Sequence, residues 1–140
     1  SIGTKNTGFS TALGADFDTP AMALLEGMAF VLTHALPVIV VCADEAAPEN
    51  LVSNDEGWGF LSMAVALAPA DSAPSGMPRI SAPERGAGSW LIPDLPQSLA
   101  RSPVVGLLDL IAALADEHAP DARLDRGRGG GYGVRIVRGT

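Results

Sequence analysis

The carboxylates that could support acid–base chemistry stand in two places. Asp16 and Asp18 are separated by one residue and come just before an apolar run, whereas Asp44 directly follows a β-branched run with Cys42 near its end. Carboxylates just past the carboxyl end of a strand lie where open α/β sheets commonly bind ligands. The alternative is that all three carboxylates shape solvated turns, because no histidine stands near them in sequence.

Other catalytic and metal-binding patterns are missing from the sequence. There is no Gly-x-Ser-x-Gly elbow, and His34 and His118 lie far apart without a zinc-type spacing, so we expect neither a catalytic triad nor a metal site. Cys42 sits inside an apolar run and is expected to be a small buried filler rather than a nucleophile. The glycine-rich stretch 127–133 precedes a strand pattern rather than a helix, which predicts a flexible turn and not a phosphate cradle.

Composition excludes several classes of protein. A length of 140 residues, with 47% apolar and 18% charged residues, predicts one folded domain over residues 1–140. A net charge of −7 argues against binding to nucleic acid, and no apolar run is long enough to span a membrane. The single cysteine cannot form an internal disulfide, so we expect a reducing compartment, the cytoplasm.

The elements that must position the acidic residues begin with a helix over residues 19–34. Thr19 can cap its first turn, Pro20 suits the first helical position, and the apolar residues Ala21, Leu24, Leu25, Met28 and Leu32 recur at helical spacing. A second apolar stripe, Met22, Leu25 and Ala29, suggests that one side of this helix meets another chain. The β-branched run 38–42 predicts a strand that is buried on both faces.

Three further elements follow along the chain. Alternation predicts a strand near residues 60–67, and Ser102 and Pro103 open a helix that closes before Pro120. A strand over residues 132–137 follows the glycine-rich turn, while residues 68–101 form a Pro/Ala/Gly-rich excursion. The expected fold class is α/β, a layered arrangement with a mixed sheet and a buried helix.

The order of strand, sharp turn, buried helix and buried strand over residues 8–41 resembles the N-terminal half of a β-ketoacyl synthase, which has a thiolase-like fold. The matching stretches are residues 23–26 and 41–48, and the likeness is best over residues 1–67. It is closest to a divergent group that includes the chain-length-factor-like small subunits of aryl polyene biosynthesis. The resemblance implies that the chain lacks the first strands of that fold.

The resemblance also implies where catalysis would occur. It places the family's catalytic cysteine near Phe17 or Asp18, where this sequence has no cysteine, and the family's catalytic histidines have no counterpart here. It therefore implies a catalytically silent subunit, without cofactor or metal, that pairs with an active ketosynthase subunit or with itself. The partner would carry the chain bound to acyl carrier protein, and the silent subunit would help shape its tunnel.

Two alternatives to this subunit remain. One is a small acyl-processing enzyme that uses Asp16, Asp18 or Asp44 as acid or base, and the other is a standalone scaffold. The family resemblance further implies that a strand at residues 9–13 and the helix after it face the dimer partner. The expected interface residues are Phe9, Ser10, Thr11, Ala12, Leu13, Met22 and Leu25.

Overall fold

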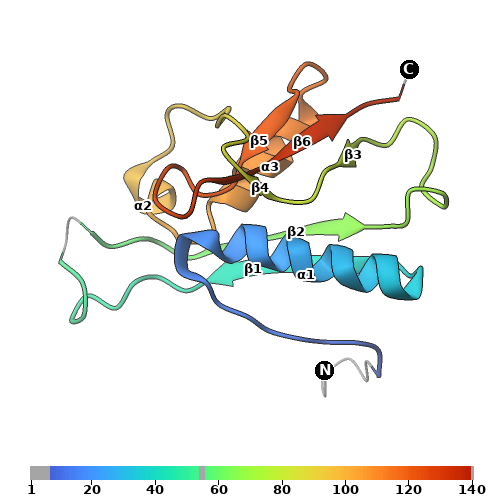
Figure 1. The fold of residues 1–140 in the computed structure, drawn as a ribbon. Helices are drawn as coiled ribbons and strands as arrows, with labels where there is room; N and C mark the ends of the chain where they lie inside the picture. The colour runs from blue at the N-terminus through green and yellow to red at the C-terminus, as the bar shows by residue number, and fades with distance from the viewer. Residues whose placement is uncertain (1–6, 54–55, 140) are drawn as a thin grey trace.

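Two antiparallel sheets and two longer helices surround a shared core (Figure 1). The computed structural model describes residues 7–53 and 56–139. In chain order its elements are η1 (Asp16–Asp18), α1 (Thr19–His34), β1 (Val38–Asp44), β2 (Leu61–Leu67), β3 (Arg79–Ile80), β4 (Glu84–Arg85), α2 (Gln97–Ala100), α3 (Gly106–Ala115), β5 (Asp121–Arg123) and β6 (Tyr132–Val137). This layering confirms the α/β class; the strand pairings within the described ranges are all antiparallel, where a mixed sheet was expected.

Helix α1 has the predicted bounds, but its first turn is built differently from the expectation. Pro20 lies in the first turn, as predicted. The Thr19 hydroxyl does not cap that turn; its Oγ1 accepts a hydrogen bond from the Ala15 amide at 2.9 Å. At the other end, Ala35 adopts a left-handed conformation and its amide donates to the Val31 carbonyl.

The β1–β2 hairpin presents one face to α1 and leaves the other face open. The register pairs Val38 with Leu67 and Asp44 with Leu61. Val40 is buried, whereas Ile39 and Val41 are 68% and 59% exposed, so the prediction that this strand is buried on both faces is wrong. A run of β-branched residues without polar alternation does not distinguish a strand with two covered faces from one whose second face is apolar and open.

A glycine permits the close contact between α1 and this hairpin. A Cβ atom at Gly27 would lie 2.7 Å from Val40 Cγ2 and 3.1 Å from Leu67 Cδ1. At Gly27 the close neighbour of α1 is therefore the inner face of the hairpin.

The second sheet is organised around β6, which has the predicted bounds. β3 pairs with its carboxyl end, β4 with its amino end, and β5 pairs over Arg135, Val134 and Gly133. β3, β4 and α2 are short elements within the proline-rich excursion. Helix α3 begins four residues after the predicted start at Ser102, because the intervening residues form turns.

One apolar cluster joins all these layers. Its buried members come from α1 (Ala21, Leu24), from β1 (Cys42), and from the later part of the chain (Val104, Leu107, Leu110, Ala113, Ala119, Ala122, Leu124, Val134, Ile136). Half-buried side chains of β2 pack against it, which agrees with the predicted alternation of that strand. Most of the core therefore comes from residues that follow the excursion, although α1 and the hairpin precede it.

Candidate functional site

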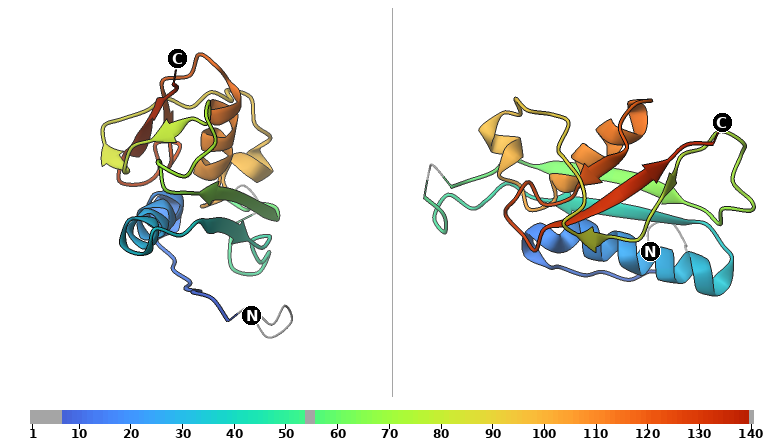
Figure 2. Two further views of the ribbon diagram at one scale, coloured as in Figure 1. Left: turned by 90° about the vertical axis from the view of Figure 1, so that its right-hand side faces the viewer. Right: turned by 45° about the horizontal axis from the view of Figure 1, so that its top comes forward.

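The start of α1 and the carboxyl end of β1 lie at the same end of the molecule (Figures 1 and 2). The loop after β1, helix α2 and the glycine-rich loop between β5 and β6 gather at this end as well. Asp16 and Asp18 in η1 and Asp44 at the end of β1 all lie at this end. The contacts around η1 show what these residues can do.

The turn before α1 is closed by the glycine-rich loop. Oδ1 of Asp18 accepts a hydrogen bond from the Gly130 amide at 2.7 Å, and the Arg128 guanidinium lies 5.4 Å from the centre of the Phe17 ring. A Cβ atom at Gly129 would lie 2.3 Å from Asp18 Oδ1, so the loop can approach this closely only with glycine. Asp16, beside them, is exposed and has a φ of +50°.

Asp125 holds the glycine-rich loop in shape. Its buried carboxylate accepts hydrogen bonds from Arg123 Nε at 2.7 Å and from the amides of Gly127, Gly131 and Gly129 at 2.8, 2.7 and 3.2 Å. Burial alone would raise the pKa of Asp125, but these hydrogen bonds outweigh it and lower the pKa. The loop is thus an ordered, hydrogen-bonded turn rather than the flexible turn expected from its glycine content. Three of its amides already donate to an internal carboxylate.

The remaining titratable candidates do not form a catalytic group. Asp44 is half-buried at the end of β1, and no contact among the described residues joins it to Asp16 or Asp18. Cys42 is 2% exposed, and burial raises the pKa of its thiol to about 11, which keeps it protonated near neutral pH. The prediction that Cys42 is buried is therefore confirmed.

The two histidines are also separate from this end. The His34 ring lies 4.6 Å from the Phe30 ring at the far end of α1, and His118 follows α3. Within residues 7–53 and 56–139, no group of three acidic, histidine or cysteine side chains is placed to hold a metal ion.

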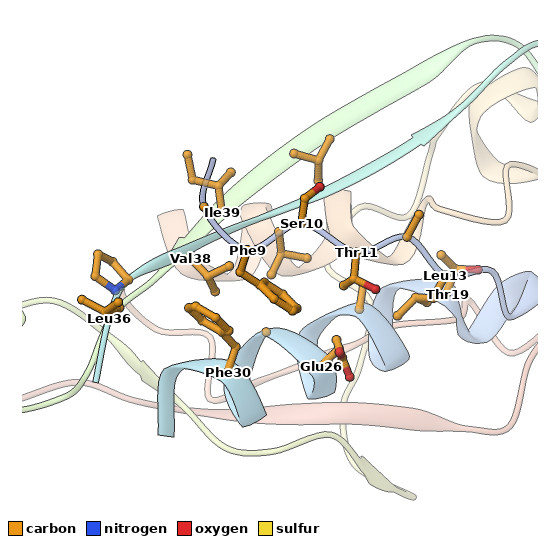
Figure 3. Close-up of a pocket in the computed structure, with 17 residues that line it drawn as sticks. Phe9, Ser10, Thr11, Leu13, Thr19, Glu26, Phe30, Leu36, Val38 and Ile39 are labelled. Carbon is orange, nitrogen blue, oxygen red and sulfur yellow. The ribbon is translucent and has the colours of Figure 1, made fainter. Parts of the chain in front are cut away.

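A groove runs along the side of α1, between the segment 8–13 and β1 (Figure 3). Its volume is about 680 Å³, and the Phe9 and Phe30 rings stack within it at 4.4 Å. Apolar side chains of β1 and the residues before it form the opposite wall, and Glu26 and Thr19 add polar groups. The groove follows the edge of β1 that has no partner strand in the described part of the chain.

The expected interface residues lie on or near this groove. Residues 9–13 are all exposed, but they form no strand in either sheet, so the strand predicted there is wrong for the single chain. Leu25 is 44% exposed, whereas Met22 is half-buried and packs against the core. The stripe predicted to face the core is also only partly correct, since Leu24 is buried but Leu32 is 85% exposed.

Comparison with known protein families gives the affiliation of the chain. Residues 1–90 match the family model described as the N-terminal domain of beta-ketoacyl synthase. The chain belongs to the β-ketoacyl synthase family. Searches of curated proteins and of solved structures returned no match.

The matched segment, residues 1–90, contains one part of the site, and the other part lies after it. η1, α1 and the groove belong to the matched ketosynthase segment, while the glycine-rich loop and Asp125 lie beyond it. The contact between Asp18 and Gly130 therefore joins the ketosynthase segment to the rest of the chain. No described helix is both long and apolar enough to cross a membrane.

Proposed function

We propose that this chain is a catalytically silent, chain-length-factor-like subunit that pairs with an active β-ketoacyl synthase in the cytoplasm. The observation that carries the proposal is the turn at Phe17 and Asp18, the position at which the sequence resemblance places the catalytic cysteine. The turn bears no thiol, and the Asp18 carboxylate accepts the Gly130 amide. Cys42, the one cysteine, is buried with a raised pKa. Covalent capture of an acyl group needs an accessible thiolate, which this arrangement does not offer.

The groove beside α1 supports a role in shaping the path of an acyl chain. Most of the residues that line it are apolar, with polar groups among them, and its outer rim, residues 8–13, is exposed. A partner that covers the rim would turn the open groove into an enclosed apolar channel. Each methylene group of the acyl chain that moves from water into this channel would then contribute about 0.8 kcal/mol of favourable free energy. In this proposal the partner supplies the chemistry and the carrier-bound chain, as the resemblance to aryl polyene subunits suggests.

The first test is assembly. Co-expression with an active β-ketoacyl synthase from the same organism, followed by light scattering on the purified material, is expected to give a one-to-one complex of stable mass. A monomer that hydrolyses acyl thioesters would overturn the proposal in favour of an enzyme that uses Asp16, Asp18 or Asp44. A self-dimer with no affinity for the ketosynthase would overturn the heteromeric pairing.

The second test locates the interface. Ala12→Asp and Leu25→Lys place a charge on the exposed rim and on the exposed side of α1, where an uncompensated buried charge costs about 3–5 kcal/mol. We expect both variants to split the complex while the subunit melts as the parent does. Ala70→Asp, at an exposed alanine of the excursion, is the matched control.

Met22 needs a different expectation because it packs against the core. Met22→Lys should lower the stability of the isolated subunit as well as its assembly. If Ala12→Asp and Leu25→Lys both leave the mass of the complex unchanged, the partner surface does not include the groove.

A further inference from the structure

A second, smaller cavity lies at the end of the molecule where α1 begins. Its volume is about 320 Å³, and Phe17, Glu56, Trp58, Arg101 and Arg128 line it. This is the low end of the size range of small-molecule sites. These side chains come from η1, from the loop between β1 and β2, from the end of α2 and from the glycine-rich loop.

The two arginines give this cavity an unusual charge. The chain as a whole carries −7, and Arg123, Arg126 and Arg135 each pair with a carboxylate. Among the described residues, neither Arg101 nor Arg128 has a carboxylate within 4.0 Å. Among the described residues that line the cavity, Glu56 is the single acidic group, which leaves them a net positive charge of one to be matched by a ligand.

The walls of the cavity are held in place by contacts outside it. The Trp58 indole donates to the Glu45 carbonyl at 2.9 Å, and the neighbouring Gly59 amide donates to the Ser98 carbonyl of α2 at 2.8 Å. On the other side, the Arg128 amide donates to the Asp125 carbonyl at 2.9 Å. Two aromatic residues and two arginines thus line one open cavity whose backbone is held by hydrogen bonds, an arrangement suited to an anion attached to a flat apolar body.

We propose that this cavity binds a small monocarboxylate that carries a flat apolar group. The guanidinium groups of Arg101 and Arg128 receive the carboxylate, and the rings of Phe17 and Trp58 contact the flat part. A dianion such as phosphate fits less well, because Glu56 leaves one positive charge rather than two. The inference does not depend on pairing with a ketosynthase.

The test is calorimetric titration of the full chain with trans-cinnamate, with cinnamyl alcohol as the uncharged probe of the same shape. We expect cinnamate to bind at least tenfold more tightly than the alcohol and than inorganic phosphate. Arg101→Gln and Arg128→Gln are each expected to weaken cinnamate at least tenfold. Arg79→Gln, at an exposed arginine of β3 that does not line the cavity, should bind as the parent does.

Circular dichroism melting of each variant shows whether the fold is kept. Phe17→Leu provides an independent variant, since it should weaken cinnamate but leave the weaker binding of acetate unchanged. The proposal is overturned if the alcohol or phosphate binds as tightly as cinnamate. It is also overturned if folded Arg101→Gln and Arg128→Gln proteins both bind cinnamate as the parent does.

Discussion

Replacement of Asp125 tests whether the glycine-rich loop depends on one buried carboxylate. Asp125→Ala removes the acceptor for the Arg123 guanidinium and for the amides of Gly127, Gly129 and Gly131. The exposed amides near the loop tip can bind water instead, but Arg123 and Gly131 are only partly exposed. Each buried donor left without an acceptor costs about 1–3 kcal/mol, and loss of one partner of a buried ion pair costs about 3–5 kcal/mol.

We therefore expect Asp125→Ala to lower the free energy of unfolding by about 3–5 kcal/mol, a large part of the roughly 5–15 kcal/mol typical of a domain. Urea denaturation followed by circular dichroism measures this difference at pH 7. Asp125→Asn should lower the free energy of unfolding by less, because the side-chain carbonyl oxygen of asparagine can still accept hydrogen bonds from one side of the loop. Asp71→Ala, at an exposed aspartate, is the control and should change the free energy of unfolding by less than about 0.5 kcal/mol.

The pH dependence gives a second measure of the same carboxylate. The pKa of Asp125 is lower in the folded chain than its ordinary value of 3.8, so its contribution is complete above that value and is lost as the pH falls through the folded pKa. The difference between the parent and Asp125→Ala should thus shrink below pH 4. A loss under 1 kcal/mol at pH 7, or a difference that grows on acidification, would refute the assignment of the loop's order to Asp125.

Three further experiments test features of the matched ketosynthase segment. Cys42 should resist iodoacetamide in the native chain and react only in denaturant, as mass spectrometry would show, because the thiol is buried and its pKa is about 11; native labelling would contradict this. Asp18→Asn should have a melting temperature within a few degrees of the parent, because its amide oxygen can still accept from the Gly130 amide, whereas Asp18→Ala should melt at a lower temperature. Equal melting temperatures of the two variants would show that this hydrogen bond does not contribute to stability. Gly27→Ala should lower the free energy of unfolding, measured by urea denaturation, by about 1–2 kcal/mol. The new methyl group would lie 2.7 Å from Val40 Cγ2, and the resulting strain exceeds the gain of about 1 kcal/mol in helix propensity. A more stable variant would show that the hairpin moves aside at little cost.

Local patterns in the sequence predicted the longer elements well. The bounds of α1 and β6 are those expected from Pro20, helical spacing and alternation, although Thr19 does not cap α1, and β1 extends two residues beyond the predicted run. β5 was missed because its three residues, Asp-Ala-Arg, have no apolar alternation and pair only through β6. The strand expected over residues 9–13 came from the family resemblance, and the single chain supplies no partner strand for it.

The candidate site was predicted less completely, because its decisive contacts join residues far apart in sequence. Asp18 and Gly130 are 112 positions apart, and neither residue type indicates the other. Composition suggested a flexible turn in the glycine-rich stretch, yet the glycines are needed for close approach to Asp18 and for amides that face Asp125. Asp125, two residues before the stretch, is the one local signal that could have indicated an ordered loop.

The core combines residues from the beginning and the end of the chain, so it cannot form until most of the chain has been synthesised. Leu24 and Cys42 belong to one core cluster with residues of α3, β5 and β6, and Val134 and Ile136 of β6 lie more than 90 positions after Cys42. At about 5–20 residues per second, the ribosome needs roughly 5–20 s to make that interval. Throughout this time the apolar surfaces of α1 and the hairpin that meet these later elements have no native covering, so a nascent chain halted within the excursion should be a strong client for chaperones.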